Sequence, residues 1–142
     1  KKHRRVRCTL DTGAAVSVIP TKMAHLGKSV ESTNPMRCQT ATGEAAKEVA
    51  TVHVEGLSDE WIPLGTDLRV MEPSVTKTLI AAVPTCRKGH RIVLDLDKGS
   101  YIQFKNGKKV DLYVHGDVFC FDLWLDDKPK PQSSPFGRQA KP

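Results

Sequence analysis

One carboxylate, Asp11, lies in an otherwise uncharged stretch, residues 8–20, which reads CTLDTGAAVSVIP. A carboxylate on a tight turn can activate water for hydrolysis, provided that a second carboxylate shares one proton with it. Gly13 would let a backbone or a substrate approach closely, because it has no Cβ atom. Asp11 is therefore the candidate catalytic residue, and the candidates for supporting its turn are Thr12, Gly13 and Ala14.

The second carboxylate is not found in the same chain. Asp-Thr-Gly occurs once, and the other aspartates beside a glycine, in residues 97–99 and 116–117, lack the hydroxyl and the apolar flanks. We therefore expect two copies to pair about a two-fold axis, each contributing one Asp11. The chemistry expected is peptide hydrolysis by water held between the two carboxylates, with no metal and no cofactor. Activity should fall at high pH, where both carboxylates are ionised.

The rest of the sequence predicts the elements that would position this turn. The chain of 142 residues is long enough for one compact domain, and its apolar residues are mainly Val, Leu, Ile and Ala. Recurrent alternation of polar and apolar residues predicts a mostly β fold. Strands are expected at residues 6–10, 16–20, 50–56 and 67–71, and in a meander from residue 90 to residue 125.

Turn signals separate these strands. A short helical turn is expected at residues 23–26, stopped by Gly27. Asn106 and Gly107 predict a type I′ hairpin turn, which needs positive φ at both positions. The apolar run at residues 79–83 is expected in the core. A further hairpin is expected in the stretch around residues 34–56, with its tip at the small polar and apolar residues Ala41, Thr42, Gly43 and Glu44.

The segment LDTGAAVSVIP resembles the active-site segment of the retroviral-type aspartic proteases, or retropepsins, of retroviruses and retrotransposon polyproteins. The stretch ATGE begins thirty residues after Asp11, where the resemblance implies a flap that closes over a bound peptide. The later stretch TLIA is similar to the apolar segment that crosses beneath the catalytic turn, which would make a floor of Leu79, Ile80 and Ala81. The pattern with KGHRIVLD and NGKKVDLYVHGDVFCFDLWL looks more like Ty1/copia-type retrotransposon polyproteins than like vertebrate retroviral proteases.

This resemblance implies a retropepsin-like closed β-barrel or sandwich with a flap hairpin and one short helix, acting as a homodimer. The implied substrate is an extended peptide of a Gag-Pol-type polyprotein. The expected organisation is a basic arm at residues 1–5, a protease domain at 6–125 with extra strands at 100–125, and a disordered Pro-rich tail at 126–142.

The chain departs from the family pattern at three points. Ala81 stands where family members usually have Gly, and Ala15 stands where retroviral members often have Asp. Only ten residues precede Asp11, fewer than the strand pair that retroviral enzymes place before the motif. The extra strands after residue 100 are therefore candidates for a different dimer interface.

The formal charge of +6 leaves other functions open. The opening KKHRRVR could contact nucleic acid, because clustered Lys and Arg release counterions from phosphates, although no aromatic residues are interleaved with them. A second alternative is a non-catalytic dimerisation or assembly module of a retroelement polyprotein. A third is Asp11 in a purely structural turn.

Four cysteines lie far apart, with no CxxC pair. Cys86 and His90 have no second ligand pair, so we expect free thiols and no zinc site. The sequence has no secretory signal and no long apolar span, which predicts no membrane contact and an intracellular, cytoplasmic location, either free or in retroelement particles. The chain begins with Lys and not with Met, which indicates a piece of a longer polypeptide.

Overall fold

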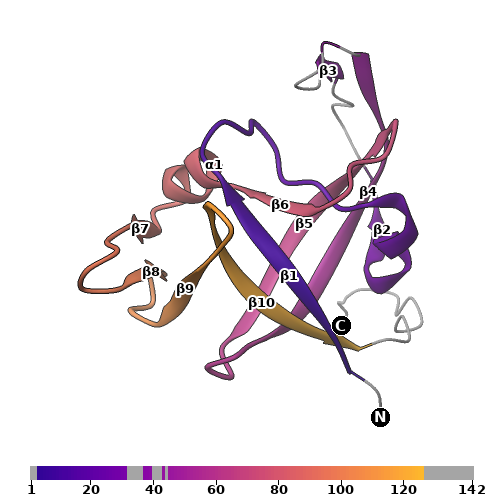
Figure 1. Cartoon of the computed structure of the whole chain (residues 1–142). Helices are drawn as coiled ribbons and strands as arrows, with labels where there is room; N and C mark the ends of the chain where they lie inside the picture. Colours follow the sequence, from indigo (N-terminus) through magenta and orange to yellow (C-terminus); the bar gives the residue numbers. More distant parts are fainter. Residues whose placement is uncertain (1–2, 32–36, 40–42, 44, 127–142) are drawn as a thin grey trace.

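The fold is built almost entirely from strands, which confirms the mostly β prediction. The computed structural model describes residues 3–31, 37–39, 43 and 45–126, arranged as Figure 1 shows. Its strands are β1 (His3–Asp11), β2 (Lys28–Val30), β3 (Arg37–Gln39), β4 (Ala45–Ser58), β5 (Pro63–Glu72), β6 (Thr78–Ala81), β7 (Arg91–Val93), β8 (Ser100–Gln103), β9 (Lys109–His115) and β10 (Val118–Asp126).

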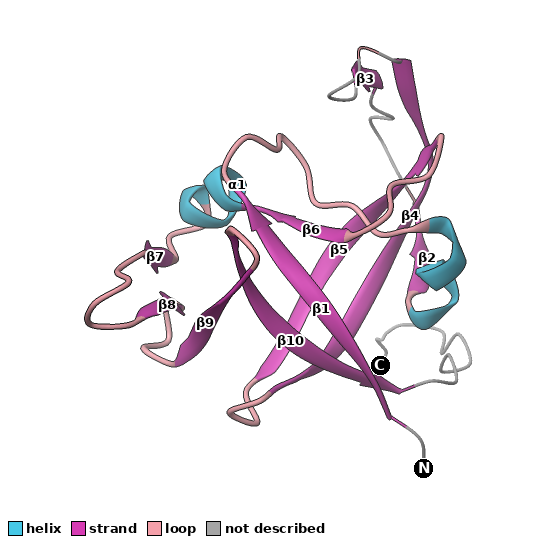
Figure 2. Cartoon of the chain, in the orientation of Figure 1, coloured by secondary structure: helices cyan, strands magenta, loops and turns pink. Residues whose placement is uncertain are grey.

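Two short helices interrupt the strands (Figure 2). The 3₁₀ helix η1 (Thr21–Leu26) ends at Gly27, so the helical turn predicted there is confirmed. The helix α1 (Ala82–Arg87) carries Pro84 in its first turn, where the missing N–H of proline costs no intrahelical hydrogen bond. The prediction of a single short helix is therefore wrong. Within the described ranges, no helix has the length and the apolar character needed to cross a membrane.

The strands form an open sheet, so the predicted closed barrel is wrong. Hydrogen-bonded neighbours follow the order β2-β4-β10-β9-β8-β7; β1 lies beside β10 and β6, while β3 and β5 lie beside β4. Within the described residues, β5 and β6 are not paired with each other. The segment predicted as a strand at residues 16–20 lies between these two strands and makes only isolated bridges there, from Val18 to Arg69 and to Leu79, so the predicted strand is wrong.

The last described strand covers one edge of β1. Residues 3–9 of β1 pair antiparallel with residues 120–126 of β10. The basic arm predicted for residues 1–5 therefore shares its last three residues with β1. The extra strands predicted after residue 100 include β10, which supplies the antiparallel neighbour of the strand that carries Asp11. Of the predicted tail, only Asp126 lies within the described residues.

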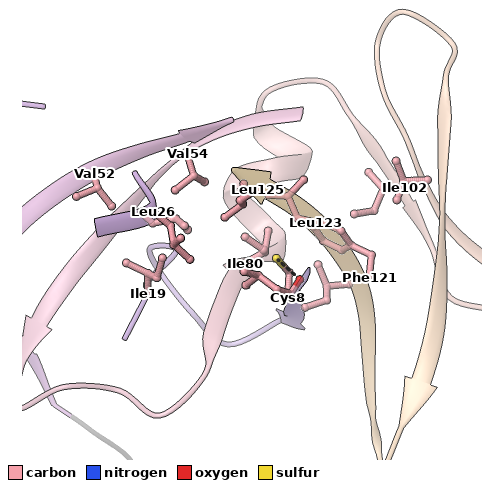
Figure 3. Packing of buried hydrophobic residues seen from close by; sticks show 14 of the residues in the cluster. Cys8, Ile19, Leu26, Val52, Val54, Ile80, Ile102, Phe121, Leu123 and Leu125 are labelled. Carbon is pink, nitrogen blue, oxygen red and sulfur yellow. Dashed lines mark hydrogen bonds between the residues drawn. The ribbon is translucent and has the colours of Figure 1, made fainter. Parts of the chain in front are cut away.

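Alternate residues of β1 enter the hydrophobic core, as the sequence alternation predicts. Val6, Cys8 and Leu10 are 2%, 2% and 7% exposed. In Figure 3, Cys8 lies among aliphatic and aromatic side chains contributed by β6 and β10, including those of Ile80 and Phe121. Burial of this face fixes the register of β1, since a shift by one residue would turn the apolar set outward.

The hairpin between β8 and β9 is confirmed, but its turn differs from the predicted one. Gly107 has a φ of +88°, whereas Asn106 is not among the described residues with positive φ, so a type I′ turn is excluded. The N–H of Gly107 donates to the carbonyl of Phe104 at 2.8 Å. The side chain of Asn106 instead accepts a hydrogen bond from the N–H of Lys108 at 2.9 Å, which stabilises a longer loop.

The apolar run at residues 79–83 is not buried throughout. Ala81 and Ala82 are 0% and 6% exposed, but Val83 is 45% exposed. The prediction of a buried run is therefore wrong at Val83. The physical reason is the change from strand to helix after Ala81, which ends the pairing with β1.

Candidate active site

Asp11 is the last residue of β1 and lies beside the end of β6. These strands run parallel, with Leu10 opposite Ile80 and Asp11 opposite Ala81. The structure therefore brings the predicted catalytic residue together with the predicted floor segment. Ile80 and Ala81 are buried, at 8% and 0% exposed, so they support the turn from within the core.

The turn after β1 holds the Asp11 carboxylate by a local hydrogen bond. The N–H of Gly13 donates to Oδ1 of Asp11 at 2.9 Å, and Gly13 itself is exposed. The Asp11 side chain is half-buried, and its second oxygen has no hydrogen-bond partner among the described residues. Thr12 is exposed and Ala14 is half-buried. One carboxylate oxygen is thus oriented by the backbone while the other is left for a ligand or a partner.

The chain then returns beneath the turn and is fixed between two strands. Val18 and Leu79 exchange two backbone hydrogen bonds, each of 2.9 Å. On the other side, Arg69 of β5 receives a hydrogen bond from the N–H of Ile19 at 3.0 Å and donates one to the carbonyl of Ser17 at 2.9 Å. Residues 17–19 therefore lie between β6 and β5, and the loop that carries Asp11 is anchored at its far end.

Ser17 is a functional candidate that the sequence reasoning missed. Its hydroxyl accepts a hydrogen bond of 2.9 Å from the N–H of Ala81, the residue opposite Asp11. A serine between Val16 and Val18 was the available signal, since a polar residue within an apolar run needs a partner when it is buried. Ser17 thus joins the returning segment to the end of β6.

A buried ion pair, also missed, lies on the strands behind this segment. The carboxylate of Glu48, whose side chain is 1% exposed, contacts the guanidinium of Arg69. The hydroxyl of Thr51 donates to the same carboxylate at 2.7 Å. Glu48 follows directly after the part of β4 that pairs with β3, at a break in the register with β5. The pair therefore links the base of the β3–β4 hairpin to the backbone that anchors the Asp11 loop.

The hairpin predicted as a flap is present as paired strands. Residues 37–39 of β3 pair antiparallel with residues 45–47 of β4, on either side of the predicted tip. Gly43 has a φ of +87°, a conformation that glycine adopts without steric cost. The other tip residues, Ala41, Thr42 and Glu44, lie outside the described residues.

The described thiols are not paired with one another. Cys8 and Cys120 are buried and Cys86 is exposed. Burial raises the pKa of the Cys8 thiol to about 12, with smaller contributions from Asp122 and Cys120. Across the described residues, no group of three His, Cys, Asp or Glu side chains is placed to hold a metal ion.

Comparisons of the chain with protein-family models, with curated proteins and with solved structures found no match.

Proposed function

We propose that this chain is a homodimeric aspartic endopeptidase that cleaves a retroelement Gag-Pol-type polyprotein, with a retropepsin-like arrangement of its active-site strands. The observation that carries the proposal is the Asp11 carboxylate itself, half-buried at the end of β1, held at one oxygen by Gly13 and unpaired at the other among the described residues. Four backbone hydrogen bonds to residues 17–19 fix the loop behind it. A rigid loop suits a carboxylate that must meet its symmetry mate at one defined distance.

In the proposed mechanism, the two Asp11 carboxylates share one proton and hold the lytic water between them. The ionised carboxylate takes a proton from the water as it attacks the scissile carbonyl, and the protonated one donates to the carbonyl oxygen. The tetrahedral intermediate then breaks down as the leaving nitrogen receives a proton from the pair. Exposed Thr12 is available to bond across the two-fold axis.

The proposed substrate is a polyprotein segment bound as an extended strand. The β3–β4 hairpin would supply one strand neighbour for the peptide, as in other cases of peptide binding by strand addition. Ala81 and Ile80 are buried and would act through the turn, not by touching the peptide. Ala15 carries no carboxylate to bind substrate ends.

The direct test replaces Asp11 by Asn and measures cleavage of extended peptides and of a longer precursor by mass spectrometry of the new termini. We expect Asp11→Asn to abolish cleavage and to leave the dimer intact, because the amide keeps the shape but cannot accept the proton from water. Asp111→Asn, on the exposed part of β9, is the matched control and should cleave like the wild type. The proposal fails if the wild-type chain at high concentration cleaves nothing and does not bind a pepstatin-type inhibitor.

The other two functions differ in what supports them. An assembly module would dimerise without cleaving, and Asp11→Asn would then change no measured property. For the nucleic-acid function, the basic run is partly neutralised, because the guanidinium of Arg5 pairs with the buried carboxylate of Asp122. The protease is therefore the function that the geometry favours.

A further inference from the structure

Positive charge is concentrated in one segment of the chain. Residues 87–109 contain seven of the 22 Lys and Arg residues but only two of the 16 Asp and Glu residues. The segment therefore has a net charge of +5, against +6 for the whole chain, and the rest of the chain is almost neutral. All seven cations are exposed: Arg87, Lys88, Arg91, Lys98, Lys105, Lys108 and Lys109. Charge gathered in this way attracts polyanions.

The pairing register places part of this charge on one face of β7, β8 and β9, which lie together on the left of Figure 1. Arg91 is opposite Gln103, and Gln103 is opposite Lys109, so these residues form one row across the three strands. Tyr101 is the middle residue of the next row on the same side. We call the two rows together the β7–β9 face; its residues are Arg91, Val93, Tyr101, Gln103, Lys109 and Asp111.

The β7–β9 face points away from the hydrophobic core. Ile102 and Val110, which alternate with its residues along β8 and β9, are 2% and 1% exposed and belong to the core cluster. Successive side chains of a strand lie on opposite sides of a sheet, so the β7–β9 face is the outer side. Arg91 and Lys109 are exposed there, and Tyr101 is half-buried.

An aromatic ring and a cation lie together on this face. Nζ of Lys109 is 4.4 Å from the centroid of the Tyr101 ring. Lysine and arginine side chains neutralise phosphates, and an aromatic ring stacks on a base of any sequence. The amide of Gln103, between the two cations of its row, can both donate and accept hydrogen bonds. The face therefore offers the groups that a nucleotide chain requires.

Further cations lie at the end of the sheet next to Arg91. The N–H of Lys105 donates to Nδ1 of His90 at 3.2 Å, which joins the turn after β8 to the loop before β7. A Cβ atom at Gly89 would lie 2.8 Å from Cδ of Lys105, so the lysine stem packs over that loop. Burial, followed by the charges of Lys105 and Lys88, lowers the pKa of His90. These lysines therefore extend the positive surface beyond the row of Arg91.

The opposite end of the face is acidic. Asp111 belongs to the row of Tyr101, and its N–H donates to Oε2 of Glu60 at 2.7 Å. Two carboxylates thus lie on that side and would repel a polyanion. A bound strand would consequently follow the row from Arg91 to Lys109 and place one base towards Tyr101.

We propose that the β7–β9 face binds single-stranded nucleic acid, with Arg91 and Lys109 on phosphates and the Tyr101 ring stacked on a base. A single strand suits this face better than a duplex, because bases can stack on a sheet only when they are unpaired, and no helix is presented here to enter a major groove. The proposal does not depend on the protease function, since Asp11 takes no part in it.

This site differs from the basic run at the start of the chain. The guanidinium of Arg5 in that run is paired with the buried carboxylate of Asp122. Arg91 and Lys109, in contrast, form no salt bridge with any residue that the structure describes. Their charges are therefore free to bind phosphates.

The test measures binding of the full chain to fluorescein-labelled 12-nucleotide oligouridylate and oligothymidylate by fluorescence anisotropy, over a series of salt concentrations. We expect the double variant Arg91→Gln with Lys109→Gln to raise the Kd about tenfold. The slope of log Kd against log salt should fall by about 1.4, because each phosphate contact on a single strand contributes about 0.7. Preference for oligouridylate would assign the face to RNA, and equal binding would show that it accepts both nucleic acids.

Tyr101→Leu tests the stacking contact. It should raise the Kd about tenfold with little change in the salt slope, because the ring carries no charge. Tyr101→Phe keeps the ring and should bind like the wild type. This pair of variants gives a second measurement if the charge variant is unstable.

Two controls separate this site from the charge of the whole chain. Lys22→Gln with Lys77→Gln removes the same charge at other exposed positions and should change the Kd less than about threefold. Arg4→Gln with Arg7→Gln removes two charges from the amino-terminal run and should also leave most of the affinity.

The proposal is overturned if neither oligonucleotide binds, or if the β7–β9 variants bind like the two controls. Tighter binding of a duplex than of a single strand would also contradict it. Equal displacement of the oligonucleotide by polyglutamate would instead identify an acidic protein as the partner and overturn the nucleic-acid assignment.

Discussion

The hydroxyl of Ser17 accepts a hydrogen bond from the backbone N–H of Ala81 at 2.9 Å. Ala81 is 0% exposed, so its N–H has no access to water, and the serine is the group that satisfies it. Because Ala81 stands opposite Asp11, a side chain six residues after the candidate carboxylate stabilises the strand end beside it.

Replacing Ser17 by Ala should lower the free energy of unfolding by about 1–3 kcal/mol, since it leaves a buried N–H without a partner. It should also reduce cleavage by allowing the Asp11 loop to move. Urea denaturation and peptide cleavage rates measure the two effects. Ser29→Ala, on the exposed face of β2, serves as the control and should change neither. Wild-type stability in both variants would contradict the assigned role of Ser17.

Replacing Glu48 by Gln should destabilise the fold by about 1–3 kcal/mol, because the buried carboxylate loses its charge-assisted contact with the partly exposed guanidinium of Arg69. Arg69→Met combined with Glu48→Gln should be less harmful than the sum of the single changes, which a double-mutant cycle in urea would reveal. Lys47→Gln, an exposed neighbour, is the control for a loss of charge on β4. Additive single and double effects would show that Glu48 and Arg69 do not depend on one another.

Gly56→Ala should disturb the contact between β4 and β10. A Cβ atom at this position would lie 2.5 Å from the carbonyl oxygen of Trp124 and 2.6 Å from Cδ2 of Leu125. Overpacking of this kind costs about 1–3 kcal/mol, which thermal or urea unfolding can measure. Gly65→Ala is the matched control on β5, because its Cβ would come no closer than 3.3 Å and only to side-chain atoms. Equal stability of the two variants would argue against close packing at Gly56.

The cysteines should differ in reactivity. Burial raises the pKa of the Cys8 thiol to about 12 from its ordinary value of 9.0. Its folded-state preference for the proton adds stability that is complete below pH 9.0 and is lost as the pH rises towards 12. Iodoacetamide at pH 9 should therefore modify the exposed Cys86 rapidly and Cys8 only after unfolding, as peptide mass spectrometry would show. Equal labelling of both in the folded protein would be inconsistent with the buried position of Cys8.

Local patterns in the sequence predicted most of the strands, but not the partners across the sheet. The alternation before Asp11 was enough to place β1, and Gly27 was enough to end η1. The contacts between distant strands depend instead on how the strands pair in the folded chain. No local signal shows that Ser17 would bond to Ala81, since these residues are far apart in the chain.

Two errors have definite physical causes. The type I′ turn was wrong because the side chain of Asn106 accepts a local hydrogen bond and the loop is longer than two residues. The closed barrel was wrong because residues 17–19, which lie between β5 and β6, make isolated bridges there and no strand. Both depend on hydrogen bonds that residue composition does not specify.

The pairing of β1 with β10 joins the beginning of the described chain to its end. Residues 3–9 of β1 cannot form this pairing until residues 120–126 of β10 have been synthesised. Contacts so distant in sequence form slowly, since a long loop must close before they are gained. During synthesis, the strand that carries Asp11 can therefore pair with β6 earlier, but with β10 only after nearly the whole described chain has left the ribosome. Under the proposed function, cleavage would therefore begin only after this late pairing is complete.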